Sequence, residues 1–171
     1  PEFEPLEPGS TGSQLVAGLQ TYEFEITTDS PAAQAWFNQG LVLLYGFNHG
    51  EAVRSFQEAA AHDPGAAMPW WGIAFANGMN INLPEVTEAQ WKAGREAAER
   101  ALALLDEESE IERALVEAAA ARTAWPPPED QRPYDEAYAA AMKDVHARFS
   151  DNADVAALYA ESLMNLQPWD Y

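Results

Sequence analysis

Three histidines, His49, His62 and His146, are the side chains of this sequence best suited to binding a metal or transferring a proton. No two of them lie three or four residues apart, and a zinc site requires three or four convergent ligands. We therefore expect them to have structural or surface roles, and we assign no metal site. The run from Asp151 to Asp154 resembles the start of a calcium-binding loop, but the rest of that pattern is missing. We interpret this run as a turn and a helix cap.

Catalytic motifs are equally scarce. The sequence has no glycine-rich phosphate loop, no His-Glu-x-x-His motif and no context typical of a Ser-His-Asp triad. With 28 aspartates and glutamates, pairing any two as general acid and base would be arbitrary. The absence of cysteine excludes disulfides and thiolate metal sites. The sequence therefore assigns no catalytic residue and no cofactor.

Any site must be positioned by helices, because the apolar residues recur with helical spacing and no strand pattern lies between the helical segments. The expected elements are a hairpin from Pro31 to Asp63 with its turn at Gly46–Gly50, a helix around Trp70, and helices over 87–105, 107–124, 134–149 and 155–166. Thr87 and Gln90 form a capping box at the start of the fourth helix. We predict an all-α fold of about seven helices.

The first 29 residues differ from the rest. Residues 1–13 are rich in proline, glutamate, glycine and serine, which is typical of disorder. Tyr22, Phe24 and Ile26 alternate with polar residues, which is a strand signal. Because no partner strand is apparent, we expect this run to lie along a helix or to join a sheet edge elsewhere. We divide the chain into an acidic, largely disordered or extended segment (1–29) and a helical repeat domain (30–171).

The hairpin resembles one tetratricopeptide (TPR) repeat, an antiparallel helix pair. The matching pattern is W-x3-G-x11-A-x3-F-x2-A-x4-P, formed by Trp36, Gly40, Ala52, Phe56, Ala59 and Pro64. Gly40 and Ala52 would let the two backbones approach, Phe56 would fill the volume beside them, and Asn48 in the turn tolerates left-handed geometry. A second copy begins one period later at Trp70 but ends in a long loop, Asn77–Pro84. The resemblance implies an array of TPR-like hairpins forming a superhelix.

The same resemblance implies which residues face the concave groove of such an array. They are Phe37, Asn38 and Leu41 in the first repeat, Trp71 and Phe75 in the second, and Glu161 and Asn165 in the last helix. Apolar walls with a few polar groups suit a ligand pocket. The alternative is that the aromatic residues are core, as aromatic stripes at helical spacing usually are.

The loop after Trp71 adds two candidate ligand-binding residues, Asn80 and Asn82. Asparagine favours turns for local reasons, so a purely structural role is the alternative. The loop is nevertheless longer than a repeat needs, and insertions in repeat proteins often lie on the binding face.

Several strings are similar to the N-terminal part of a family of large bacterial TPR-repeat proteins of poorly defined function. They are Phe37–Leu41, Trp70–Ala74, Asn80–Asn82 and Pro168–Tyr171. Members of that family continue into further helices rich in histidine, which implies a possible metal-dependent enzyme with ligands outside this sequence. The last helix also has no capping helix after it, so we expect this chain to be part of a longer protein.

Charge limits the class of partner. The formal net charge is −19, which argues against nucleic acid, because phosphate binding relies on lysine and arginine. No apolar run is long enough to span a membrane. The acidity favours basic partners or is simply a solvated surface. Compartment is not determined.

Three functional hypotheses follow. The first is a TPR-repeat binding scaffold whose aromatic concave groove holds a peptide or small molecule. The alternative is the N-terminal portion of an enzyme, which can be metal-dependent, whose partner is the remainder of its own protein. The third is a structural assembly module. The chaperone-binding TPR clamp is not matched, because Phe37, Leu41 and Trp71 stand where it would need basic residues.

Overall fold

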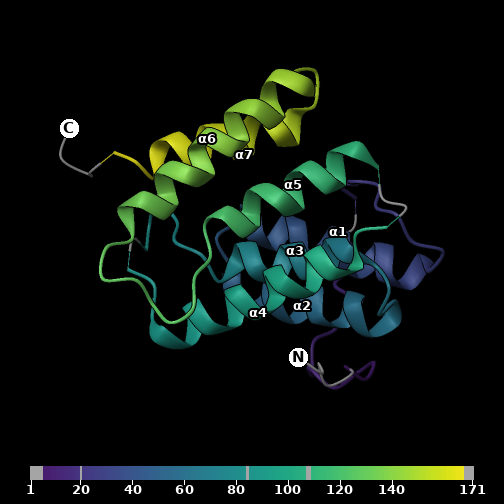
Figure 1. Cartoon of the computed structure of the whole chain (residues 1–171). Helices are drawn as coiled ribbons and strands as arrows, with labels where there is room; N and C mark the ends of the chain where they lie inside the picture. Colours follow the sequence, from purple (N-terminus) through teal and green to yellow (C-terminus); the bar gives the residue numbers. More distant parts are fainter. Residues whose placement is uncertain (1–5, 20, 84, 107–108, 168–171) are drawn as a thin grey trace.

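Seven α-helices follow one another in the computed structural model, which describes residues 6–19, 21–83, 85–106 and 109–167 (Figure 1). They are α1 (Pro31–Tyr45), α2 (His49–His62), α3 (Ala67–Ala76), α4 (Glu88–Leu104), α5 (Glu110–Ala121), α6 (Arg132–Arg148) and α7 (Ala153–Met164). The expected all-α array of about seven helices is confirmed. The 168–171 string, which forms part of the family resemblance, lies outside the described residues.

Each helix packs on the next along the chain, and α3 also contacts α1 and α5. The first five helices thus form one body in which α3 contacts both α1 and α5. The α6–α7 pair lies together beyond α5, as Figure 1 shows. At the level of the backbone, α7 is adjacent to α6 and to no other helix of the described chain.

Two glycines allow α1, α2 and α3 to pack closely around one phenylalanine. A Cβ atom added to Gly40 in α1 or to Gly72 in α3 would lie 2.6 Å from the ring of Phe56 in α2. The close approach expected at Gly40 is therefore confirmed. Phe56 is fully buried, so the ring takes the volume that the two missing side chains leave free.

The turn between α1 and α2 differs from the expectation. The left-handed residue is Phe47, with φ of 58°, while Asn48 has φ of −90° and precedes α2. Phe47 is half exposed, and its ring lies edge-on against the His49 imidazole at 5.9 Å. Asn48, which tolerates left-handed geometry, does not use it here, because that tolerance is a local tendency, which the hairpin overrides.

Local capping sets where the later helices begin. The capping box of Thr87 and Gln90 is confirmed at α4. A second one, Ser109 with Glu112, starts α5 at Glu110 rather than at the expected 107. Asn152 accepts a hydrogen bond from the backbone of Val155 at 2.9 Å, which confirms the run containing it as a turn and helix cap.

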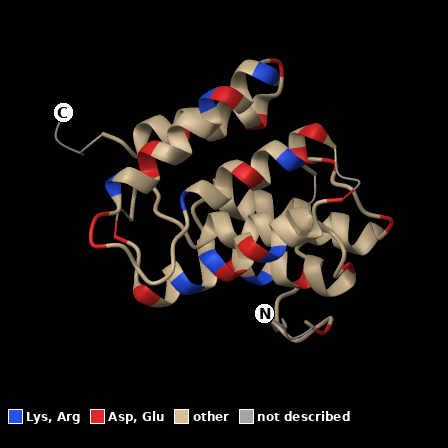
Figure 2. Ribbon diagram, in the orientation of Figure 1, with Lys and Arg blue, Asp and Glu red and all other residues tan. Residues whose placement is uncertain are grey.

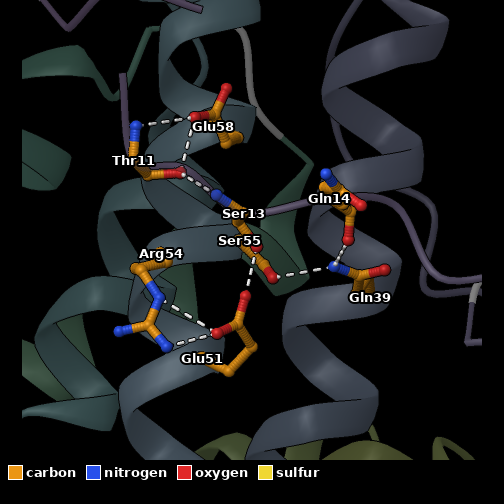
Figure 3. A network of polar contacts seen from close by, with 8 residues as sticks. All are labelled: Thr11, Ser13, Gln14, Gln39, Glu51, Arg54, Ser55 and Glu58. Atoms are coloured by element: carbon orange, nitrogen blue, oxygen red, sulfur yellow. Dashed lines mark hydrogen bonds and ion pairs between the residues drawn. The ribbon is translucent and has the colours of Figure 1, made fainter. Parts of the chain in front are cut away.

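The segment before α1 is attached to α1 and α2 by hydrogen bonds, several of them drawn in Figure 3. The Glu58 carboxylate, on a buried residue of α2, accepts from the amides of Gly9 and Thr11 at 2.7 and 3.0 Å and from the Thr11 hydroxyl. Gln39 of α1, also buried, donates to the Gln14 carbonyl at 3.0 Å. Residues 6–13, for which composition indicated disorder, thus supply partners to buried polar groups.

The alternating run before α1 forms no strand within the described residues 21–29. Phe24 and Ile26 are buried, and Gln34 of α1 hydrogen-bonds the Phe24 carbonyl and the Ile26 amide at 2.8 and 3.0 Å. The strand interpretation is therefore wrong. The run is extended along a helix, which was one of the two placements considered.

Candidate functional site

The four apolar residues expected in the concave groove share one surface of α1 and α3. Phe37, Leu41, Trp71 and Phe75 are 0%, 1%, 3% and 7% exposed. Their aromatic rings follow one another, with centroids 6.3 Å apart from Phe37 to Trp71 and 5.5 Å apart from Trp71 to Phe75. They line a filled space in this structure, and binding of a ligand there stays a prediction.

Leu158 of α7 and Phe24 of the N-terminal segment pack against these residues, Phe37, Leu41 and Trp71 among them. Leu158 and Phe24, together with Met68 of α3 and Leu115 of α5, enclose a gap too small for a water molecule. We use the name α1–α3–α5 surface for Phe37, Leu41, Met68, Trp71 and Leu115, which line this gap with Leu158 of α7, together with Phe75 and Arg122 beside them. In this structure the aromatic residues are packed as core residues, which was the alternative interpretation of the sequence.

One end of α7 is held by two tyrosines. The hydroxyl of Tyr45, at the end of α1, donates to the Asp154 carboxylate at 2.7 Å, and the hydroxyl of Tyr22 donates to it at 2.9 Å. Asp154 is buried. Burial and the hydrogen bond to Asp154 both raise the pKa of Tyr45, so it remains a neutral donor at physiological pH.

The other end of α7 faces a buried arginine at the end of α5. The side chain of Arg122 is only 2% exposed. Its Cζ lies 4.9 Å from the Phe75 ring centroid and 4.7 Å from that of Tyr138 in α6, distances typical of cation–π contacts. It also donates a hydrogen bond to the Met79 carbonyl. A Cβ added to Gly78 would lie 2.7 Å from its Nη2, so a larger residue at this position of the loop would force the guanidinium to shift.

Two carboxylates accompany Arg122. Oε2 of Glu161 in α7 lies 3.9 Å from Nη1 of Arg122. The Asp135 carboxylate of α6 also interacts electrostatically with the Arg122 guanidinium. Burial raises the pKa of both carboxyls, more than the nearby guanidinium lowers it. Asn165 donates from Nδ2 to the other Glu161 oxygen, Oε1. We call Arg122, Asp135, Glu161 and Asn165 the Arg122 centre.

The Arg122 centre contains buried polar atoms that lack hydrogen-bond partners. They are Nη1 of Arg122, Oε2 of Glu161 and Oδ1 of Asn165. Leaving such an atom unsatisfied costs about 1–3 kcal/mol. The contact between α5 and α7 is therefore incomplete in its hydrogen bonding.

The remaining asparagines have other partners. Asn80 accepts within its own loop, from the amides of Asn82 and Leu83 at 3.0 and 3.1 Å, and Asn82 is exposed. Asn38 accepts from Gln34 at 2.8 Å. The structure therefore brings Phe75, Glu161 and Asn165 together only around Arg122. The side chains of Asn38 and Asn80 have structural hydrogen bonds, and that of Asn82 is exposed. The 77–84 loop reaches the Arg122 centre through Gly78 and the Met79 carbonyl instead.

Arg122 is the residue that sequence reasoning missed. It follows Leu115 and Ala118 at i+7 and i+4, and so continues the apolar stripe of the fifth helix. An arginine at an apolar-stripe position of an alanine-rich helix was the available signal.

In Figure 2 the acidic residues are spread over helices and loops, and the basic residues on the lower helices of that view alternate with acidic ones. Among the described residues, no three His, Asp or Glu side chains converge as a potential metal site. No helix in the described part of the chain is long and apolar enough to cross a membrane.

Comparison with known proteins returns no match to any family model, curated protein or solved structure. Assignment to the TPR superfamily therefore remains a proposal that rests on the repeat pattern. The candidate site stands on its geometry alone: an aromatic surface with one buried cation at its end.

Proposed function

We propose that this chain is a TPR-like helical-repeat scaffold that binds a peptide on its α1–α3–α5 surface. The observation that carries the proposal is Arg122, a buried guanidinium at the end of an aromatic surface, whose Nη1 lies 3.9 Å from Glu161 but makes no hydrogen bond. The sequence has only nine lysines and arginines against 28 acidic residues. Burying one of so few cations needs compensating contacts, which Glu161, the Met79 carbonyl and two aromatic rings supply here, and the hydrogen bond that Nη1 lacks is open to a carboxylate of a ligand.

The chemistry of this surface selects the ligand class. Phe37, Leu41 and Trp71 offer an apolar wall, and Arg122 offers a charged N–H that favours a carboxylate. A ligand should therefore carry an apolar side chain and, separated from it, an acidic group. Because α7 covers the surface here, binding requires α7 to move, which lowers the apparent affinity in proportion to the open fraction.

A displayed library of random peptides tests this function on the full chain. The unaltered chain should enrich peptides that combine leucine or an aromatic residue with aspartate or glutamate. Arg122→Met should lose the acidic preference, whereas Arg132→Met, at an exposed position in α6, should retain it. Circular dichroism establishes that both variants remain helical. No enrichment by the unaltered chain, or the same acidic peptides with Arg122→Met, would contradict the proposal.

A second proposal is the N-terminal portion of an enzyme. It is favoured by one observation, the raised pKa of both Asp135 and Glu161 beside a buried arginine, since perturbed carboxyls cluster at catalytic sites. Metal content and activity of the complete gene product, measured with and without Glu161→Gln, test it. A metal-free product whose properties do not respond to this substitution would contradict it.

A further inference from the structure

We propose that α7 occupies the place of an external ligand, and that the α1–α3–α5 surface recognises an acidic amphipathic helix carrying the pattern Asp-x3-Leu-x2-Glu-x3-Asn. The inference rests on the proposed binding function and names the ligand class of the same surface. It identifies α7 as a built-in copy of the ligand that keeps the surface closed.

The pattern is a single stripe along α7. Asp154, Leu158, Glu161 and Asn165 stand at i, i+4, i+7 and i+11, which places them on one face of a helix over about 16 Å. Asp154, Leu158 and Glu161 contact parts of the chain outside the α6–α7 pair. Asn165 donates a hydrogen bond to Glu161 and so supports it. This is the spacing by which a helix binds in a groove.

Each position of the stripe meets a matching group. Asp154 accepts hydrogen bonds from Tyr22 and Tyr45 at one end. Leu158, 2% exposed, fills the apolar middle. At the other end Glu161 lies 3.9 Å from the Arg122 guanidinium. The surface therefore presents donor, apolar and cationic sections in a fixed order, and only one direction of the helix satisfies all three.

The opposite face of α7 belongs to α6. Tyr159 stacks on His146 of α6, with ring centroids 5.3 Å apart. The backbone of α7 has α6 as its helical neighbour and does not approach α1, α3 or α5. Leaving the surface thus removes the side-chain contacts that this one stripe makes with the N-terminal segment, α1, α3 and α5.

The fit of α7 is incomplete in a way that leaves room for a better ligand. Nη1 of Arg122 and Oε2 of Glu161 are buried, 3.9 Å apart and without hydrogen-bond partners. A free helix can place its carboxylate in bidentate contact with the guanidinium, a stronger arrangement. The connection through α6 fixes the position of α7 and prevents this adjustment.

A synthetic peptide of residues 150–167 with a fluorescent label is the probe, and anisotropy is the measurement. It should bind the full chain carrying Leu158→Asp, whose own α7 is unseated, about tenfold or more tightly than the unaltered chain. The unaltered chain resists because its tethered α7 competes at an effective concentration of about 1 mM. A chain with Leu163→Asp, at an exposed position of α7, is the matched control and should behave as the unaltered chain.

Variant peptides define the stripe. The peptide with Leu163→Asp should bind the opened chain as well as the original, and those with Leu158→Asp or Glu161→Lys should not. Equal, weak binding of all peptides to a helical Leu158→Asp chain would overturn the inference. So would binding that ignores the two stripe substitutions.

A second experiment covers the case in which Leu158→Asp does not fold. A protease site inserted between Ser150 and Asp151 lets the folded chain be cut, so that α7 is held without a covalent link. Excess labelled peptide should then replace it, as seen by gel filtration. Retention of the original α7 without exchange would overturn the inference. If library peptides bind in a way that depends on Arg122 but the 150–167 peptide does not bind, the proposed function stands and only this inference fails.

Discussion

At the scale of single residues, Phe56 packs so closely against Gly40 and Gly72 that adding one methyl group at Gly40 should lower the stability of the fold. Gly40→Ala places a Cβ 2.6 Å from the ring, and overpacking of this kind costs about 1–3 kcal/mol. The higher helix propensity of alanine, worth about 1 kcal/mol, offsets only part of it. Chemical denaturation should show a net loss of stability.

The matched control is Gly50→Ala in α2, where an added Cβ meets nothing within 4 Å. It should be neutral or stabilising, because only the propensity gain applies. Equal effects of the two substitutions would show that the close approach at Gly40 is not required.

Glu161 makes a prediction about pH. Burial raises its pKa in the folded chain, so the folded state binds this proton more tightly than the unfolded state. The stabilising contribution is fully present below the unfolded pKa, about 4.3, and is lost as the pH rises through the folded pKa. Glu161→Gln has no such group, so the free energy of unfolding of the original chain should fall relative to that of the variant as pH rises through this window.

Urea denaturation of both chains at a series of pH values measures this difference, and Glu117→Gln, at an exposed position of α5, is the control. A difference between the original chain and Glu161→Gln that does not vary with pH would mean that the carboxyl is as well solvated folded as unfolded.

The site was only partly predictable from the sequence, for a reason visible at Arg122. Helical spacing places Glu161 and Asn165 on one stripe, and the structure keeps them together. Which element faces that stripe depends on how α6 and α7 turn back over α5, and no local pattern encodes it. Tyr22 and Tyr45 meet Asp154 across more than a hundred residues of sequence, so that contact too depends on the folded chain.

At the scale of elements, the segment before α1 is held by Glu58, and its attachment should depend on that carboxylate. Burial opposes ionisation of Glu58, but hydrogen bonds from Thr11 and Gly9 outweigh it and lower the pKa. The stabilisation is therefore present above the unfolded pKa and lost as the pH falls through the folded pKa.

Glu58→Gln should release the segment at neutral pH, because the substituted side chain keeps one acceptor oxygen and turns an N–H₂ group toward the donors of Gly9 and Thr11. Hydrogen exchange of those two amides should accelerate, while exchange within α3 stays unchanged. Unchanged protection of Gly9 and Thr11 in the variant would show that the segment is held by other contacts.

The elements themselves were more predictable than their connections. The repeat pattern places α1 and α2 because Gly40 and Phe56 must meet. Asn152 and the Thr87 capping box act locally, so they were found from the sequence. The start of α5 was placed too early because acidic residues crowd the region before it, and the Ser109 cap fixes the first turn.

At the scale of the whole molecule, the charge of −19 opposes compaction. Added salt screens this repulsion, with a screening length of about 8 Å at physiological ionic strength. The free energy of unfolding should therefore rise from low to moderate sodium chloride concentration. Thermal melts across that range measure it, and a fall in stability with salt would show that attractive ion pairs dominate.

The contacts between the helices predict that some helices of this molecule unfold locally more easily than others. The backbone of α3 is adjacent to α1, α2, α4 and α5, whereas that of α7 is adjacent to α6 alone. Local opening is easiest where few contacts must break. Native-state hydrogen exchange should therefore give α7 a lower opening free energy than α3. Leu158→Asp should lower the protection of α7 further and leave that of α3 nearly unchanged, whereas Leu163→Asp should change neither. A single opening free energy shared by α3 and α7 would make α7 an inseparable part of the core, and would remove the physical basis for its exchange with an external helix.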